Sequence, residues 1–237
     1  MFVLGIDTSS EQSSVALLCR GEVIAENQAN NSNKPSLHLL PMISELLNKA
    51  EVPVAKIDRL AGSRGPGSFT GLRTGLGTLL GLSDALDKPI YGFDSFDCIA
   101  KAMGNWGRCL LAPTSKARKG FFYLATFNYC DGPKRRTKDV EVRPSGLCEF
   151  INEPVIFVGD GFKGMEGEIR KSTPHNVLFL RSIRSGPAVG AAMLANEIIG
   201  TANLVDHNPN PKYVGRPQAE INFENASIPN KGDDDDR

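Results

Sequence analysis

The chain has 237 residues, of which 41% are hydrophobic and 23% charged, enough for one large or two small domains with a buried core. Lysine plus arginine equals aspartate plus glutamate at 27 each, so no overall charge marks the chain as a binder of nucleic acid or membranes. The 5 cysteines, odd in number and without a CxxC pair, argue against a disulfide framework or a zinc knuckle.

These properties are typical of a cytoplasmic protein. The N-terminal segment MFVLGID reaches an aspartate at position 7, which leaves no apolar core long enough for a signal peptide. No later apolar run approaches the length of a membrane span, so we expect no membrane association.

Strand-like and helix-like segments alternate through the first half of the chain. Two apolar runs separated by a polar Glu-Gln pair indicate an antiparallel hairpin, and a third run follows. Residues 39–50 repeat apolar side chains at helical spacing, and Asp94 or Ser95 can cap a helix over residues 96–103. The strand-like segments are FVLGIDTS, SSVALLCR, GEVIAENQ, IDRLAGSRG and PIYGF.

The second half repeats that order. Three strand-like runs come first, RCLLAPT, FFYLATFNY and KDVEVR, with CDGPKR as a turn, and two more follow, PVIFVGD and NVLFL. Helices are expected over GLCEFIN, capped by Ser145, and over MEGEIRK. The closing helix is expected over PAVGAAMLANEIIG, with Pro187 near its start and Gly200 at its end.

The same order of elements in both halves predicts a duplicated α/β fold, with two ribonuclease-H-like lobes as in actin, the heat-shock ATPases and sugar kinases. The N-terminal lobe is expected over residues 1–104 and the C-terminal lobe over residues 105–217. The sequence leaves open whether the closing helix, residues 187–199, packs on the second lobe or on the first. Residues 218–237 end in NKGDDDDR, whose adjacent aspartates repel one another, and are expected to be a disordered tail or an expression scar.

The segment SRGPGSFTGLRTGLGTLLGL, residues 63–82, passes from a turn-rich loop into a helix. It holds glycines at 65, 67, 71, 75, 77 and 81, and each interior glycine costs a helix about 1 kcal/mol relative to alanine. Two explanations would offset that cost. The loop amides and the helix N-terminus can bind an anion, or the missing Cβ atoms let another backbone approach closely.

Asp7, Thr8 and Ser9 stand where kinases of this superfamily place an aspartate that holds magnesium and phosphates. The matching turn of the second half offers no carboxylate, only Thr114, Ser115 and Lys116. Because phosphoryl transfer depends on positioned metal and charge, this argues against ATP turnover by the chain alone. Two roles stay open for Asp7: contact with a nucleotide, or a turn residue that bonds its own backbone.

The signals for a hydrolase are weak. His38, His175 and His207 form no HExxH motif and no pair at helical spacing, so a metallopeptidase-like site has no visible ligands. A serine nucleophile would need GxSxG, and GPGSFTG places Ser68 outside that pattern. The alternative functions are a nucleotide-binding module and, less favoured, a metallopeptidase-like hydrolase of the same superfamily.

Two short basic runs are candidates for a local patch that contacts RNA phosphates. They are Arg118 with Lys119, and Lys134 with Arg135 and Arg136. Hairpin turns are often charged merely because they face water, and the composition favours that second interpretation.

Several segments stand in a distinctive order: IDTSSEQSSVALL, SLHLLPMISELL, GPGSFTGLRTGLGTLLGL, ARKGFFY and PKYVGR. Together they resemble the TsaB (YeaZ) family of bacterial tRNA threonylcarbamoyladenosine synthesis. The resemblance covers roughly residues 1–217 and is strongest over residues 63–82.

The resemblance implies a non-catalytic subunit with no catalytic residues, resident metal or intrinsic cofactor. It implies a role beside the related catalytic subunit TsaD, which transfers threonylcarbamoyl to N6 of adenosine 37 in tRNAs that read codons beginning with A. The expected partners are a TsaD-type subunit, a TsaE-type ATPase and, through the complex, tRNA, with a homodimer when the chain is alone. The resemblance also allows ATP or ADP at the interface of the complex.

In this family the glycine-rich helix belongs to the dimer interface, which favours contact over phosphate binding for residues 63–82. The pairs Gly71 with Gly75 and Gly77 with Gly81 are then expected to let a partner helix approach. The residues expected at the partner interface are Gly67, Phe69, Gly71, Leu72, Gly75, Leu76, Leu79 and Leu80. Two positions depart from the family pattern: Lys116 stands where an acid is usual, and Phe121 where many relatives carry glutamate.

Overall fold

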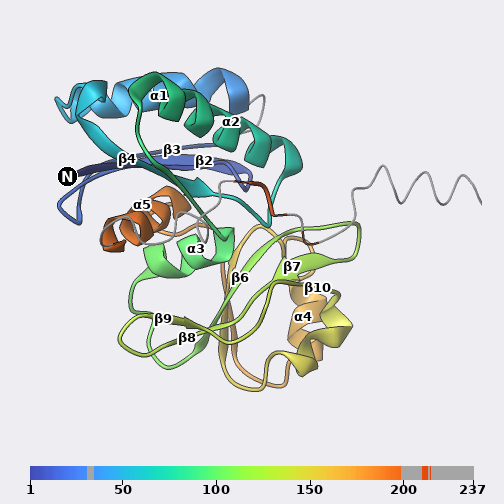
Figure 1. The fold of residues 1–237 in the computed structure, drawn as a ribbon. Coiled ribbons are helices and arrows are strands. Elements are labelled where there is room, and N and C mark those ends of the chain that lie inside the picture. Colours follow the sequence, from blue (N-terminus) through green and yellow to red (C-terminus); the bar gives the residue numbers. More distant parts are fainter. Residues whose placement is uncertain (31–34, 199–209, 213, 215–237) are drawn as a thin grey trace, which may run out of the picture.

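The two halves of the chain fold into two α/β lobes, each built on its own sheet and lying one above the other in Figure 1. The structure is a computed structural model that describes residues 1–30, 35–198, 210–212 and 214. Within those ranges no helix combines the length and the apolar character that a membrane span requires. The predicted tail at 218–237 and the predicted helix end at Gly200 lie outside the described residues.

The N-terminal lobe contains the strands that the alternating apolar runs predict. β1 pairs antiparallel with β2 and parallel with β4, so Gly5 lies between Ala16 and Ala61. The sheet order is β3-β2-β1-β4-β5. The strands are β1 (Phe2–Asp7), β2 (Gln12–Cys19), β3 (Glu22–Asn30), β4 (Ile57–Ser63) and β5 (Ile90–Phe93). The helices are α1 (Pro35–Lys49), the 3-10 turn η1 (Val54–Lys56), α2 (Phe69–Leu86) and α3 (Ser95–Met103).

The C-terminal lobe repeats that sheet order as β10-β7-β6-β11-β12, which confirms the duplicated fold. β6 pairs parallel with β11 and antiparallel with β7, as β1 does with β4 and β2. The strands are β6 (Leu110–Lys116), β7 (Phe122–Leu124), β8 (Phe127–Tyr129), β9 (Pro133–Arg135), β10 (Val140–Val142), β11 (Val155–Gly159) and β12 (Val177–Leu180). The helices are η2 (Pro144–Glu149), α4 (Glu166–Ser172) and α5 (Pro187–Glu197).

Several local boundaries differ from the sequence prediction. The expected strand FFYLATFNY divides into β7 and β8, and residues 133–135 of the expected turn CDGPKR form β9. Only residues 146–149 of GLCEFIN are helical, in a 3-10 turn that begins at Pro144, so Ser145 lies inside the turn rather than at its cap. α1 begins at Pro35, earlier than the apolar spacing indicates, because proline fits the first turn of a helix.

Helices cover both faces of the first sheet because alternate residues of β1 point to opposite sides. Leu4 and Ile6 pack beneath α1 and α2, in a cluster that includes Leu76 and Leu79. Val3 packs on the other side, in a cluster with residues of α5. Burying one such aliphatic side chain contributes about 1.5 to 3 kcal/mol, so both faces of the sheet stabilise the lobe.

α5 follows the last strand of the second lobe but packs on the first lobe, between the two sheets in Figure 1. A Cβ added to Gly5 would lie 2.1 Å from the Ala188 carbonyl oxygen, and one added to Gly190 would lie 1.9 Å from the Cys98 oxygen. These glycines let α5 press directly on β1 and α3. The predicted lobe boundary of 105–217 is therefore wrong for residues 187–197, which complete the N-terminal lobe.

Candidate functional site

A cavity of about 280 Å³ lies between the lobes. The β1–β2 turn and the start of α3 line it from one lobe, and the ends of β6 and β11 line it from the other. These strand ends meet because β6 and β11 are adjacent and parallel, with Thr114 opposite Gly159. Such carboxyl ends are where open α/β sheets commonly bind ligands. Polar residues of the lining include Ser9, Ser10, Glu11, Ser115, Asp160 and Lys163.

Of the residues expected to contact a nucleotide, Ser9 lines this cavity, and Asp7 and Thr8 do not. Thr8 is buried, and its Oγ1 donates to the Gly71 carbonyl at 2.7 Å, so it fastens the β1–β2 turn to α2. Asp7 is 1% exposed, and its Oδ1 accepts a hydrogen bond from the Ser9 amide at 3.4 Å. The structure thus corrects the assignment of Thr8. For Asp7 it supports the alternative, a turn residue that bonds its own backbone.

The hydrogen bonds of the described residues nevertheless satisfy only one of the two Asp7 carboxylate oxygens. Its Oδ2 has no hydrogen-bond partner among the described residues. Burial raises the pKa of the Asp7 carboxyl above its ordinary value, because the charged form is removed from water. An ionised carboxylate in this position lowers the stability of the fold, so a contribution to stability does not account for the presence of an aspartate here.

The second lobe supplies a carboxylate that the sequence reasoning missed. Asp160 follows β11, and its Oδ2 accepts a hydrogen bond from the Glu11 amide of the other lobe at 3.3 Å. Its Oδ1 and the Ser115 Oγ are buried without a hydrogen-bond partner in the described part of the chain, although both residues line the cavity. Burial also raises the pKa of Asp160. The available signal was the aspartate that ends the apolar run PVIFVGD.

Lys116 of β6 connects the lobes. Its Nζ forms an ion pair with Glu11, and Lys163 pairs with the other oxygen of the same carboxylate. The hydrogen bond from Lys116 is the main cause that lowers the pKa of Glu11 to about 2. The β1–β2 turn therefore carries a permanent negative charge into the cleft at physiological pH.

The glycines at the start of α2 contact the chain itself. A Cβ added to Gly71 would lie 2.0 Å from the Thr8 carbonyl oxygen, and one added to Gly75 would lie 2.3 Å from Thr8 Oγ1. A Cβ on Gly67 would lie 2.3 Å from the Ser9 oxygen. The β1–β2 turn of the same lobe is therefore the backbone that comes close to these glycines, and this packing offsets their cost to the helix.

This packing divides the predicted partner interface between two sides of α2. The inward side belongs to the lobe's own core, which corrects the prediction for Gly71, Leu72, Gly75, Leu76 and Leu79. Gly67 precedes the helix, is partly buried and packs against Ser9 of the same lobe. On the other side, Phe69 is 44% exposed and Leu80 is 47% exposed. A Cβ added to Gly77 or Gly81 would meet no described atom within 4 Å. We call this set, Phe69, Gly77, Leu80 and Gly81, the outer face of α2; the helix itself lies beside α1 in Figure 1.

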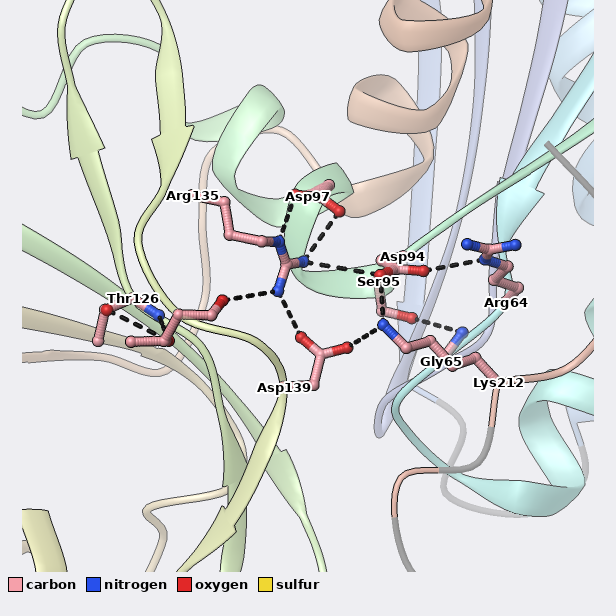
Figure 2. Close-up of polar contacts among 10 residues, drawn as sticks. Arg64, Gly65, Asp94, Ser95, Asp97, Thr126, Arg135, Asp139 and Lys212 are labelled. Atoms are coloured by element: carbon pink, nitrogen blue, oxygen red, sulfur yellow. Dashed lines mark hydrogen bonds and ion pairs between the residues drawn. The ribbon is translucent and has the colours of Figure 1, made fainter. Parts of the chain in front are cut away.

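A charged network joins the lobes beside α3 (Figure 2). Lys212 pairs with Asp94 of the N-terminal lobe and, at 2.6 Å, with Asp139 of the C-terminal lobe. Arg135 approaches the same Asp139 at 2.6 Å and Asp97 of α3 at 2.9 Å. The Asp139 side chain is 1% exposed. A buried carboxylate held by two cations thus ties residues 210–212 to both lobes.

Asp94 is the first residue before α3, as the sequence predicts, but its side chain makes no capping bond. The carboxylate instead accepts a hydrogen bond from Arg64 at 2.9 Å and another from Lys212. Burial raises the pKa of Asp94, but these two hydrogen bonds outweigh it and hold the pKa below the ordinary value. The Asp94 side chain therefore does not cap α3 but takes part in the charged network that joins the two lobes.

The predicted basic patch is largely neutralised within the chain. Arg135 belongs to the network of Figure 2, and Arg136 pairs with Glu153 at 2.5 Å. Arg118 pairs with Glu141 at 3.1 Å and lies 3.7 Å from the centre of the Phe121 ring. These contacts favour the interpretation of the runs as ordinary charges of hairpin turns.

Metal ligands do not gather in the described part of the chain. No group of three or more His, Cys, Asp or Glu side chains within it could hold a metal ion. His207 lies outside the described residues. The metallopeptidase-like alternative thus gains no support from the arrangement of side chains.

Comparison with known proteins adds to this geometry. Residues 23–138 match the family model described as TsaD: tRNA N6-adenosine threonylcarbamoyltransferase. YeaZ from Pseudomonas aeruginosa has the same fold, with a TM-score of 0.73 and 24% identity over 90% of this chain and 99% of that one. Component A of the (R)-2-hydroxyglutaryl-CoA dehydratase of Acidaminococcus fermentans shares the fold at a TM-score of 0.52 and 13% identity, over 83% of this chain and 98% of that one.

The sequence likeness is more specific than the shared fold. The tRNA threonylcarbamoyladenosine biosynthesis protein TsaB of Bacillus subtilis is 30% identical over 190 residues. The matched region covers 74% of this chain and 82% of that protein, and so spans both lobes. The chain therefore belongs to the TsaB family of tRNA threonylcarbamoyladenosine biosynthesis proteins.

Proposed function

We propose that the chain is the non-catalytic partner of a TsaD-type subunit in tRNA threonylcarbamoyladenosine synthesis, and that it binds this subunit through the outer face of α2. The observation that carries the proposal is the division of α2 into two sides. One side is packed tightly on its own lobe. The other exposes Leu80, Gly77 and Gly81, together with Phe69, whose ring centre lies 3.8 Å from the Arg73 guanidinium carbon.

The outer face of α2 has the features of a helix contact surface. Phe69 and Leu80 are large apolar residues that remain nearly half exposed. They lie about 16 Å apart along the helix at a rise of 1.5 Å per residue. Gly77 and Gly81, between and beside them, present bare backbone to which another helix can come close. Apolar anchors around a close backbone contact are typical of the buried centre of a protein interface.

The cleft favours a supporting role over catalysis. Lys116 and Lys163 are paired with Glu11, and Asp7 is not among the residues that line the cavity. The transfer chemistry is then assigned to the TsaD-type partner. Contacts with a TsaE-type ATPase and with tRNA, a homodimer of the isolated chain, and an ATP or ADP at the interface of the complex stay predictions.

Leu80→Asp tests the proposed interface. Leu80 does not belong to the buried core, so this substitution should leave the fold intact while placing a charge in the partner contact. We expect binding to the TsaD-type protein of the same organism to weaken by about tenfold or more, because burying an unpaired charge costs over 1.4 kcal/mol. Titration calorimetry and light scattering on size-exclusion peaks would measure affinity and mass.

Leu178→Asp is the matched control, because Leu178 is 53% exposed on β12 of the other lobe. It should bind the TsaD-type protein as the wild type does. Leu76→Asp is unsuitable for this test, since Leu76 is 3% exposed in the core and the change should unfold the lobe. Unchanged binding by a folded Leu80→Asp variant would refute the proposed interface.

A further inference from the structure

The mouth of the interlobe cleft contains two lysines from the same lobe. Lys116 ends β6, and Lys163 lies in the loop that follows β11. Because β6 and β11 are parallel neighbours, both ammonium groups come to the carboxyl edge of the sheet. Two positive charges at this edge form a natural position for an anion.

A carboxylate of the other lobe occupies that position. Glu11 stands at the tip of the β1–β2 turn, and its two oxygens pair with Lys116 and Lys163 separately. The turn is fixed further by the hydrogen bond from the Glu11 amide to Asp160 Oδ2 at 3.3 Å. One side chain of the N-terminal lobe thus satisfies both lysines of the C-terminal lobe.

The cavity behind Glu11 is polar and incompletely satisfied. Ser115 and Asp160 are 5% and 7% exposed, and each has a buried oxygen without a hydrogen-bond partner among the described residues. Both residues line the cavity. Buried polar atoms of this kind normally find a partner, so the cavity has hydrogen-bonding capacity that the protein itself does not use.

We propose that Glu11 is a built-in anion, which fills a two-lysine anion site at the mouth of the interlobe cleft and thereby excludes small phosphate-type anions from it. Removing the charge of Glu11 then opens the site. Lys116 and Lys163 then lose their ion-pair partner and can bind phosphate oxygens. The network of Figure 2 lies elsewhere on the lobe interface and keeps the lobes together in the variant.

Glu11→Gln with inorganic pyrophosphate as the probe tests this proposal. Titration calorimetry at low ionic strength is suitable, because salt screens exposed lysines. Glu11→Gln should bind pyrophosphate at one site, with an affinity about tenfold or more higher than any binding by the wild type, because two charge-assisted contacts become available. The variant should fold normally, since ion pairs this exposed contribute about 1 kcal/mol or less. Glu11→Ala is a second variant that removes the carboxylate without leaving an amide.

Glu153→Gln is the matched control. It removes the same charge and releases Arg136 from an ion pair outside the cleft, so it should gain no pyrophosphate binding. Adding Lys163→Met to Glu11→Gln should abolish the gained binding. Three results would overturn the proposal: equal binding by the wild type, no binding by folded Glu11 variants, or an equal gain in Glu153→Gln.

Discussion

The two kinds of glycine in α2 should respond in opposite ways to an added methyl group. Gly71→Ala places a Cβ against the backbone of the β1–β2 turn, whereas Gly77→Ala places one on the outer face of the same helix. Both substitutions raise helix propensity, and position 71, in the first turn, gains no more than the interior position 77. The difference between them therefore measures the packing of α2 on its own lobe.

The magnitudes follow from the surroundings of the added methyl groups. At position 77 the Cβ meets no described atom within 4 Å, so alanine should stabilise the chain by about 1 kcal/mol through helix propensity. At position 71 the Cβ would lie 2.0 Å from the Thr8 carbonyl oxygen, a backbone atom that cannot rotate away. Overpacking typically costs about 1 to 3 kcal/mol, and loss of the bond from Thr8 Oγ1 to Gly71 about 1 kcal/mol more. After the gain in propensity, Gly71→Ala should destabilise the chain by about 1 to 3 kcal/mol.

Urea unfolding followed by circular dichroism measures both free energies of unfolding. The two variants should differ by about 2 to 4 kcal/mol, with the wild type between them. If Gly71→Ala were as stable as Gly77→Ala, the β1–β2 turn would not be the contact that requires glycine in α2. The assignment of Gly71 and Gly75 to the chain's own core would then be refuted.

Two further substitutions test the electrostatic features. Lys212→Met should lower the free energy of unfolding, measured by urea titration, by about 1 to 3 kcal/mol, because buried Asp139 loses one of its two cations. The exposed control Lys134→Met should shift the free energy of unfolding by less than about 0.5 kcal/mol. Asp7→Asn should stabilise the chain at neutral pH, because burial raises the folded pKa of Asp7 and ionisation therefore opposes folding above that pKa. Thermal melts across pH should show this advantage shrinking as the pH falls towards 3.8, and a constant difference would contradict it.

The duplicated fold could be predicted from the sequence because local patterns determine most of it. Apolar alternation predicts strands such as β1 and β2, and helical spacing predicts α1 and α2. The position of α5 could not be predicted, since a helix of small apolar residues suits either lobe. Its place on the first lobe depends on two close backbone contacts, of Gly190 with Cys98 and of Ala188 with Gly5.

The candidate site was also less predictable, because it too depends on contacts that form only in the folded protein. A glycine pattern indicates that a backbone comes close, but not whether that backbone belongs to the same chain; for Gly71 it is Thr8. The pairing of Glu11 with Lys116 and Lys163 joins residues that are distant in sequence and share no motif. Asp160 escaped notice because the acid of the second lobe follows β11 rather than β6. Contacts between lobes depend on the assembled fold, which no single segment encodes.

Reconstituted tRNA modification tests the central claim most directly. The TsaD-type subunit of the same organism, supplied with a threonylcarbamoyl donor and unmodified tRNA, would be assayed with and without this chain by nucleoside analysis. We expect threonylcarbamoyladenosine to form efficiently only when both proteins are present, and the chain alone to form none. Modification that proceeds equally without the chain, or that the chain catalyses alone, would contradict its role as a non-catalytic partner.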